Sequence, residues 1–130
     1  MNRKVLCVDD EESILRGIRL HLSREFELVL AGSGAEGLET FEKEGPFAVV
    51  VSDMRMPGMD GASMLSKIKA LAPQTRSVLL TGHADFEFGG AEALGSGKLF
   101  HILNKPCPPE KLKNAVEEGI CEYNAEAEEA

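Results

Sequence analysis

The sequence contains no tryptophan and a single tyrosine, and aromatic residues make up only 5% of the chain. Ligand binding therefore cannot be followed by tryptophan quenching. Long hydrophobic runs are also missing, since no apolar stretch approaches the roughly 20 residues that cross a bilayer as a helix. The first residues lead directly into a strand pattern, so we expect no signal peptide. These absences predict a protein that makes no membrane contact.

Cysteine is scarce as well, with three residues at Cys7, Cys107 and Cys121. The number is odd, and no two of them have the spacing of metal ligands. Cys7 lies in an apolar run, where a free thiol behaves as a small hydrophobic side chain. We therefore expect a reduced, cytoplasmic protein without a disulfide framework.

Basic residues are outnumbered, at 14 against 22 acidic residues, which gives a formal net charge of −8. A negative field of this size disfavours nonspecific binding to nucleic acid or to anionic lipid. We therefore predict no direct contact with nucleic acid. If the protein controls a gene, another domain or a partner must bind the DNA.

The length of 130 residues suits one domain with one hydrophobic core. We assign residues 1–124 to this domain and residues 125–130 to an acidic tail or the start of a linker. The sequence contains no dimer signature, so the oligomeric state stays open.

Short apolar runs alternate with helical patterns along the whole chain. We expect strands over residues 5–8, 26–31, 47–51, 77–80 and 100–103. We expect helices over residues 11–24, 34–44, 61–72, 84–94 and 109–123. The fourth helix is weak, because Gly89 and Gly90 in its middle each cost about 1 kcal/mol. This order predicts an α/β fold with a doubly wound five-stranded parallel sheet, helices on both faces and the flavodoxin-like strand order 2-1-3-4-5.

Polar residues follow the predicted strands at the edge where the active crevice of such folds lies. Asp9 and Asp10 follow the first strand, Asp53 follows the third, Thr81 the fourth and Lys105 the fifth. Taken singly, each has an ordinary explanation as a turn former, a helix cap or a solvated charge. Their joint occurrence at strand ends that meet at one edge favours a functional site.

Clustered carboxylates repel each other, and a divalent cation removes this conflict. The candidate ligands are all oxygen atoms, and no Cys or His appears among these strand ends, so Mg2+ is the expected metal. Asp53 is then a plausible nucleophile towards phosphorus. The metal and Lys105 would neutralise charge during the transfer.

The same residues carry a family resemblance. The chain resembles the receiver domain of bacterial two-component response regulators over essentially its whole length. The matching motifs are Val8-Asp9-Asp10-Glu11, the ten residues from Ser52 to Gly61, Leu80-Thr81-Gly82 and Lys105-Pro106. The second motif is long and specific, whereas the shorter pieces would be weak alone.

The resemblance implies that Asp53 is the phosphoacceptor. It implies further that Asp10 binds Mg2+ directly, that Asp9 acts nearby, often through water, and that the backbone carbonyl of Arg55 is another metal ligand. Thr81 would hydrogen-bond one phosphoryl oxygen.

For Lys105 the resemblance implies a pairing with another phosphoryl oxygen and a cis peptide bond to Pro106. The expected donor is a sensor histidine kinase or a phosphotransfer protein. The domain would act as a phosphoacceptor switch that assists its own phosphorylation and dephosphorylation, and not as an enzyme. An output domain could follow in a longer parent chain, or the chain could be a stand-alone shuttle.

Two positions depart from the family pattern or stay open. Many receivers carry an aromatic residue three positions before the lysine, where this chain has Ile102. Phe100 could take over part of that role, although packing in the core is the preferred interpretation. His83, two residues after Thr81, could act as a pH-sensitive gate, but an exposed loop histidine is the simpler reading.

Two other functions were weighed. A flavodoxin-like cofactor module is disfavoured, because the first loop lacks a glycine-rich or hydroxyl-rich phosphate cradle. A phosphohydrolase with an aspartyl-phosphate intermediate needs a second acid, commonly two residues after the nucleophile. Arg55 occupies that position and cannot serve as an acid.

Overall fold

The computed structural model of this chain describes residues 1–82 and 99–129, which form five strands and four helices. In chain order they are β1 (Lys4–Val8), α1 (Glu12–Leu22), β2 (Glu27–Ala31), α2 (Gly34–Glu44), β3 (Val49–Asp53), α3 (Gly61–Leu71), β4 (Arg76–Thr81), β5 (His101–Asn104) and α5 (Pro109–Glu129). The helix predicted over 84–94 and His83 lie outside the described residues.

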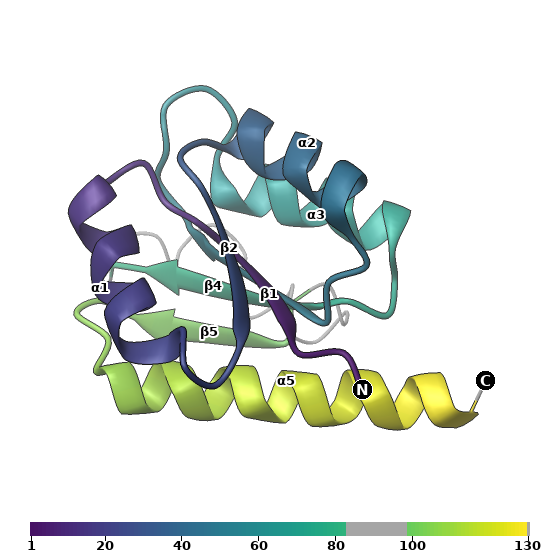
Figure 1. Ribbon diagram of the computed structural model, residues 1–130. Helices are drawn as coiled ribbons and strands as arrows, with labels where there is room; N and C mark the ends of the chain where they lie inside the picture. The colour runs from purple at the N-terminus through teal and green to yellow at the C-terminus, as the bar shows by residue number, and fades with distance from the viewer. Residues whose placement is uncertain (83–98, 130) are drawn as a thin grey trace.

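The five strands form one parallel sheet in the order β2-β1-β3-β4-β5 (Figure 1), which confirms the predicted fold. The strand order reverses between β1 and β3, because the chain first moves outward to β2 and then returns to the other side of β1. In open α/β sheets, the crevice at such a reversal is the usual ligand site.

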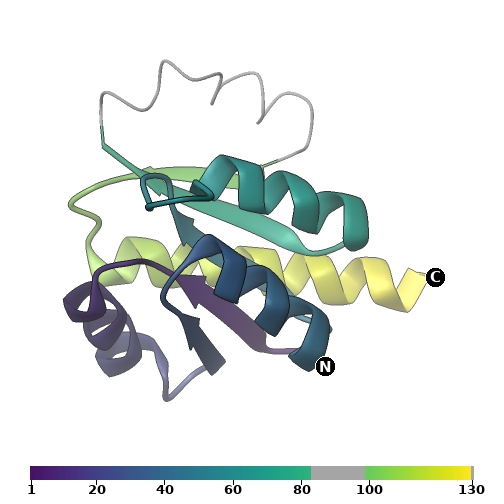
Figure 2. The same ribbon diagram turned by 90° about the horizontal axis from the view of Figure 1, so that it is seen from above.

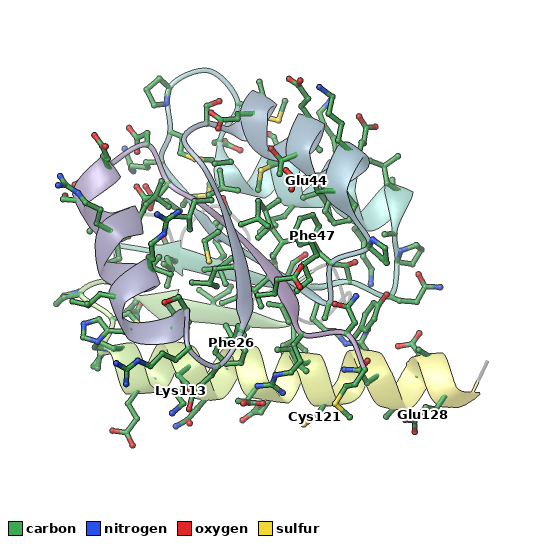
Figure 3. All side chains as sticks on the ribbon, in the orientation of Figure 1. Phe26, Glu44, Phe47, Lys113, Cys121 and Glu128 are labelled. Carbon is green, nitrogen blue, oxygen red and sulfur yellow. The ribbon has the colours of Figure 1, made fainter. Side chains whose placement is uncertain are left out.

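Helices α2 and α3 cover one face of the sheet, while α1 and α5 cover the other (Figures 1 and 2). Each face has its own hydrophobic cluster. Phe26 belongs to the cluster beside α5, and Phe47 belongs to the cluster beneath α2 and α3 (Figure 3). The central strand serves both, since Val49 and Val51 pack on one side and Val50 on the other.

Strand β3 begins and ends two residues later than predicted. Phe47 and Ala48 are buried but precede the ladder, whereas Ser52 and Asp53 belong to it. Asp53 is paired in register with Leu80 of β4 and is only 7% exposed. The prediction stopped at Val51 because hydropathy marks a polar residue as a strand end even where the backbone ladder continues.

The helix starts agree with their predicted signals. The Ser33 hydroxyl accepts a hydrogen bond from the Glu36 backbone N–H at 3.1 Å. The Asp60 carboxylate accepts one from the Ser63 N–H at 2.8 Å. These side chains satisfy amides that a helix N-terminus leaves without partners.

Helix α5 continues through Glu129, so residues 125–129 are helical where we expected an acidic tail or a linker. Arg76 of β4 holds this part of the helix, with ion-pair distances of 3.8 Å to Glu122 and 2.6 Å to Glu126. The Asn124 side chain exchanges two hydrogen bonds with the backbone of Asn2, both at 2.9 Å. The domain boundary at residue 124 stays a prediction.

None of the described helices is both long and apolar enough to cross a membrane.

Candidate functional site

Three carboxylates meet at the carboxyl ends of β1 and β3, where the strand order reverses. One oxygen each from Asp9, Asp10 and Asp53 can be chosen so that all three lie within 4.8 Å of one another. Asp9 and Asp53 are buried, at 1% and 7% exposure, while Asp10 is exposed. Two buried carboxylates this close repel each other strongly unless a positive charge lies between them.

Lys105 provides such a charge. Its Nζ atom lies 2.8 Å from Asp53 Oδ1 and 3.5 Å from Asp9 Oδ2. The backbone holds the lysine in place, since the Lys105 N–H donates to the Thr81 carbonyl at 2.8 Å. The Lys105–Pro106 peptide bond is cis, as predicted.

The pKa values of Asp9 and Lys105 are both shifted upward. Burial is the largest influence on Asp9 and raises its pKa, although the Glu11 N–H at 2.9 Å and the Lys105 charge act in the opposite direction. For Lys105, burial is again the largest single influence and acts to lower the pKa. The hydrogen bonds and charges of Asp53 and Asp9 together outweigh it and raise the pKa. The lysine is therefore firmly charged in this site.

Thr81 is the last residue of β4 and is 2% exposed. It follows Leu80, the register partner of Asp53, and therefore lies on the strand next to the proposed phosphoacceptor. Its hydroxyl donates to the Gly82 carbonyl at 3.0 Å. A rotation of this side chain would free the hydroxyl for another acceptor.

Arg55 lies in the loop between β3 and α3, directly after the buried residues Asp53 and Met54. Met54 and Met56 on either side of it are 9% and 7% exposed and pack in the cluster beneath α2 and α3. These two methionines therefore anchor the loop to the hydrophobic core. The loop backbone around Arg55 is thereby held beside the carboxylates.

The position of the usual aromatic residue is occupied by Ile102, which is partly buried and packs against the α2–α3 cluster. Phe100 is also only partly buried, and its ring lies edge-on to His101 with centroids 4.5 Å apart. The imidazole of His101 in turn lies 2.8 Å from Glu118 of α5.

The comparison with protein families agrees with this geometry. The sequence profile of the response regulator receiver domain matches residues 5–117. This chain belongs to the response regulator receiver domain family. The five-stranded sheet and its strand order are those expected of a receiver domain.

Relatives of this receiver domain include a protein of similar length and longer proteins. Sporulation initiation phosphotransferase F of Bacillus subtilis is 31% identical over 121 residues, which cover 89% of this chain and 92% of that protein. The uncharacterized transcriptional regulatory protein YesN of Bacillus subtilis is 35% identical over 123 residues, which cover 92% of this chain but 33% of that protein. This chain therefore spans about a third of the length of YesN. A crystal structure described as adenylate cyclase from Rhodopirellula baltica has a TM-score of 0.94 at 36% identity and covers 99% of this chain and 95% of that one.

Sequence reasoning missed several contacts around the site. The Ser52 hydroxyl donates to the Asp53 carbonyl at 2.9 Å, and Gly61 lies against the same carbonyl. Both residues belong to the long motif that begins at Ser52, so their presence was visible but their role was not. Only the folded backbone shows that they contact the residue at the centre of the site.

Proposed function

We propose that this receiver domain accepts a phosphoryl group on Asp53 and acts as a switch in phosphorelay signalling. The observation that carries the proposal is the position of Asp53, with Lys105 Nζ at 2.8 Å and two further carboxylates within 4.8 Å. This arrangement combines a nucleophilic oxygen with the charges that a phosphoryl transfer requires. Family membership supports the signalling role.

The donor set fits Mg2+. All three side chains offer carboxylate oxygens, and Asp10 is exposed so that ligand positions can stay open to solvent and to phosphate. We propose Asp10 and Asp53 as direct ligands, with the Arg55 carbonyl as a third and Asp9 acting nearby. Bound Mg2+ would offset the carboxylate repulsion and stabilise negative charge on the transferring group.

The residues of this chain have distinct roles in the proposed transfer. One Asp53 carboxylate oxygen forms the bond to phosphorus while the phosphorus–nitrogen bond of a donor phosphohistidine breaks, and the electron pair of that bond returns to the imidazole. Lys105 moves its charge from the Asp53 carboxylate to a phosphoryl oxygen. The Thr81 hydroxyl turns from the Gly82 carbonyl to another phosphoryl oxygen. These new contacts favour the phosphorylated conformation.

We propose a switch and not a turnover enzyme. Two residues after Asp53, where an aspartyl-phosphate phosphohydrolase commonly has its acid, this chain has Arg55. A guanidinium stays charged and cannot protonate a leaving group. Slow hydrolysis of the aspartyl phosphate, assisted by the site itself, would reset the switch.

A groove between α1 and α5 supports the proposed protein donor, a sensor histidine kinase or a phosphotransfer protein. It has a volume of about 520 Å3 and reaches the site at Lys105. Its floor is apolar, with Ile14 and Ile18 of α1 opposite Leu112 of α5. Such a floor suits the apolar ridge of a partner helix.

Exposed cations lie on or just after α1 and on α5, the two helices that border the groove. Arg16, Arg19 and Arg24, on and just after α1, and Lys111 of α5 are exposed, and within residues 1–82 and 99–129 none of them makes an ion pair. These unpaired charges stand out on a protein of net charge −8. We propose that they attract acidic residues of the phosphodonor, which acts in the cytoplasm.

For the output of the switch, we propose a kind of domain or partner and not a particular protein. YesN is named a transcriptional regulator, and its matching part is 33% of its length. We propose that a C-terminal output domain follows this receiver in a longer parent chain or that a separate partner reads its state. The acidic net charge makes direct contact with nucleic acid unfavourable for the receiver itself.

Intact-mass measurement after incubation with acetyl phosphate and Mg2+ tests the proposal. Wild type should gain the mass of one phosphoryl group, and Asp53→Asn should gain none. Asp60→Asn is the matched control in the same loop, because Asn caps a helix as well as Asp does. A wild type that gains no mass, or an Asp53→Asn variant that gains as much as wild type, would contradict the assignment.

A further inference from the structure

Gly61, the first residue of α3, lies directly against the backbone of Asp53. A Cβ atom added to Gly61 would lie 2.2 Å from the Asp53 carbonyl oxygen and 3.0 Å from the Ser52 hydroxyl oxygen. Carbon and oxygen atoms do not approach to 2.2 Å without a bond. Gly58 is the glycine of the described chain with positive φ, so Gly61 is required here for space and not for conformation. Any side chain at position 61 must displace α3 or turn the Asp53 carbonyl.

The Asp53 carbonyl is also held from its own strand. The hydroxyl of Ser52, which is fully buried, donates to it at 2.9 Å. The carbonyl therefore lies between a hydrogen-bond donor and the open space that Gly61 leaves. This contact restrains the peptide plane between Asp53 and Met54, and with it the backbone from which the Asp53 side chain extends.

The loop that follows Asp53 is closed at the same point. The Gly61 N–H donates to the Met54 carbonyl at 2.8 Å, and the Met54 N–H donates to the Leu80 carbonyl at 2.9 Å. The first hydrogen bond joins the two ends of the loop, and the second ties its start to β4. The Arg55 carbonyl, a proposed metal ligand, lies inside this closed loop.

We propose that Gly61 and Ser52 are positioning residues that set the Asp53 carboxylate and the Arg55 carbonyl at the spacing Mg2+ requires. The inference rests on the proposed function of Asp53. Mg2+ accepts near-octahedral oxygen ligands only within a narrow range, about 2.0–2.1 Å. A displacement of the Asp53 carboxylate or of the Arg55 carbonyl by a few tenths of an ångström therefore weakens the metal site before it unfolds the protein.

Gly34 offers a matched control within the same chain. It is the first residue of α2, and a Cβ there would lie 2.8 Å from the Met59 carbonyl oxygen, at the far end of the same loop. Ser33 and Asp60 cap the two helices in the same way. Gly34→Ala and Gly61→Ala therefore introduce the same group at the same helical position with a backbone clash in both cases. Only Gly61 contacts Asp53.

The test is Mg2+ binding without any phosphodonor, measured by isothermal titration calorimetry and accompanied by thermal unfolding in EDTA. Changes in residues that orient metal ligands commonly cost about 10–100-fold in affinity, and we expect a rise in Kd of this size for Gly61→Ala. For Gly34→Ala we expect a Kd close to wild type, with a comparable loss of thermal stability. Ser52→Ala, which removes the donor without adding volume, should raise the Kd while the protein stays folded.

The outcomes separate this inference from the proposed function. A folded Gly61→Ala variant with wild-type Mg2+ affinity would overturn it, as would equal losses of affinity in Gly61→Ala and Gly34→Ala. If Gly61→Ala does not fold, Ser52→Ala decides, and an unchanged Kd in that variant overturns the inference. A wild type that binds no Mg2+ and gains no phosphoryl group would instead overturn the function on which the inference rests.

Discussion

The ammonium group of Lys105 lies 2.8 Å from Asp53 Oδ1, although β4 lies between β3, which ends at Asp53, and β5, which ends just before Lys105. The lysine follows β5, and its side chain reaches past the end of β4 to the last residue of β3. It also lies 3.5 Å from Asp9. Lys105 thus neutralises part of the negative charge of the carboxylate cluster. The remaining repulsion among the carboxylates should affect the stability of the protein, and this effect can be measured.

We expect Asp9→Asn to be more stable than wild type at neutral pH in the absence of Mg2+. Burial raises the pKa of Asp9 above its usual 3.8, so the folded state binds this proton more readily than the unfolded state. Ionised Asp9 therefore opposes folding, and the loss of stability develops as the pH rises from 3.8 through the raised pKa. An asparagine removes this charge and still accepts the Glu11 N–H.

The measurement is a series of thermal unfolding curves, followed by circular dichroism, from acidic to neutral pH in EDTA. The Tm of Asp9→Asn should exceed that of wild type by a few degrees at neutral pH, and the difference should shrink towards pH 3.8. Glu42→Gln, at an exposed position of α2, controls for the loss of one negative charge. A neutral-pH Tm of Asp9→Asn below that of wild type would contradict the argument.

Mg2+ should stabilise the wild type by mass action. At a free concentration of 100 times the Kd, a ligand that binds only the folded state adds about 2.7 kcal/mol to the free energy of unfolding. Asp10→Asn, which removes an exposed carboxylate of the cluster, should lose most of this gain. Urea unfolding with and without Mg2+ measures it, and NaCl at matched ionic strength is the control. Equal stabilisation by NaCl would point to general screening instead of a site.

Two helical glycines should respond in opposite ways to alanine. No atom lies within 4 Å of a Cβ built on Gly17 of α1, so Gly17→Ala should gain up to about 1 kcal/mol from helix propensity alone. A Cβ on Gly119 of α5 would lie 2.8 Å from Val49 Cγ2 and 3.3 Å from Arg76 Cβ. This overpacking should cost about 1–3 kcal/mol. Urea unfolding of both variants measures the difference, and a gain at Gly119 would show that α5 can move away from β3.

Charge reversal on α1 should separate protein donors from small donors. Arg16→Glu with Arg19→Glu places negative charge on α1, outside the carboxylate cluster. With the purified partner kinase, phosphotransfer to this double variant should be at least about tenfold slower than to wild type at low salt. This size is in keeping with the effect of charge steering on association. Uptake from acetyl phosphate should be unchanged.

Lys67→Glu is the control for this pair, because Lys67 is an exposed cation on α3 that also makes no ion pair within the described chain. It changes the net charge in the same direction on the opposite face of the sheet. Equal rate losses for α1 and Lys67 variants would show that net charge alone governs the encounter and would contradict docking at α1.

Much of the fold could be predicted because its signals are local. Residues 47–51 are apolar on both faces and end in three valines, and this pattern suits a strand covered by helices on both sides. Ser33 and Asp60 cap helices through their own side chains, and those contacts span three residues. Strand ends were less predictable, because Asp53 is polar yet continues the ladder, and hydropathy does not record backbone pairing.

The candidate site was predictable to the level of which residues approach one another. The ends of parallel strands share one edge, so Asp9, Asp53 and Lys105 had to lie near each other once the strand order was inferred. The sequence alone determined the alternation of strands and helices, the position of the acidic residues and the family motifs. Each of these depends on neighbours along the chain.

Only the tertiary structure decided which contacts these residues make. Three contacts join residues that lie apart in the sequence. Lys105 lies against Asp53, Gly61 lies against the Asp53 carbonyl, and Arg76 forms an ion pair with Glu126 near the end of α5. Such contacts depend on how strands and helices pack in three dimensions, to within a few tenths of an ångström. Spacing along the chain carries no information at that scale.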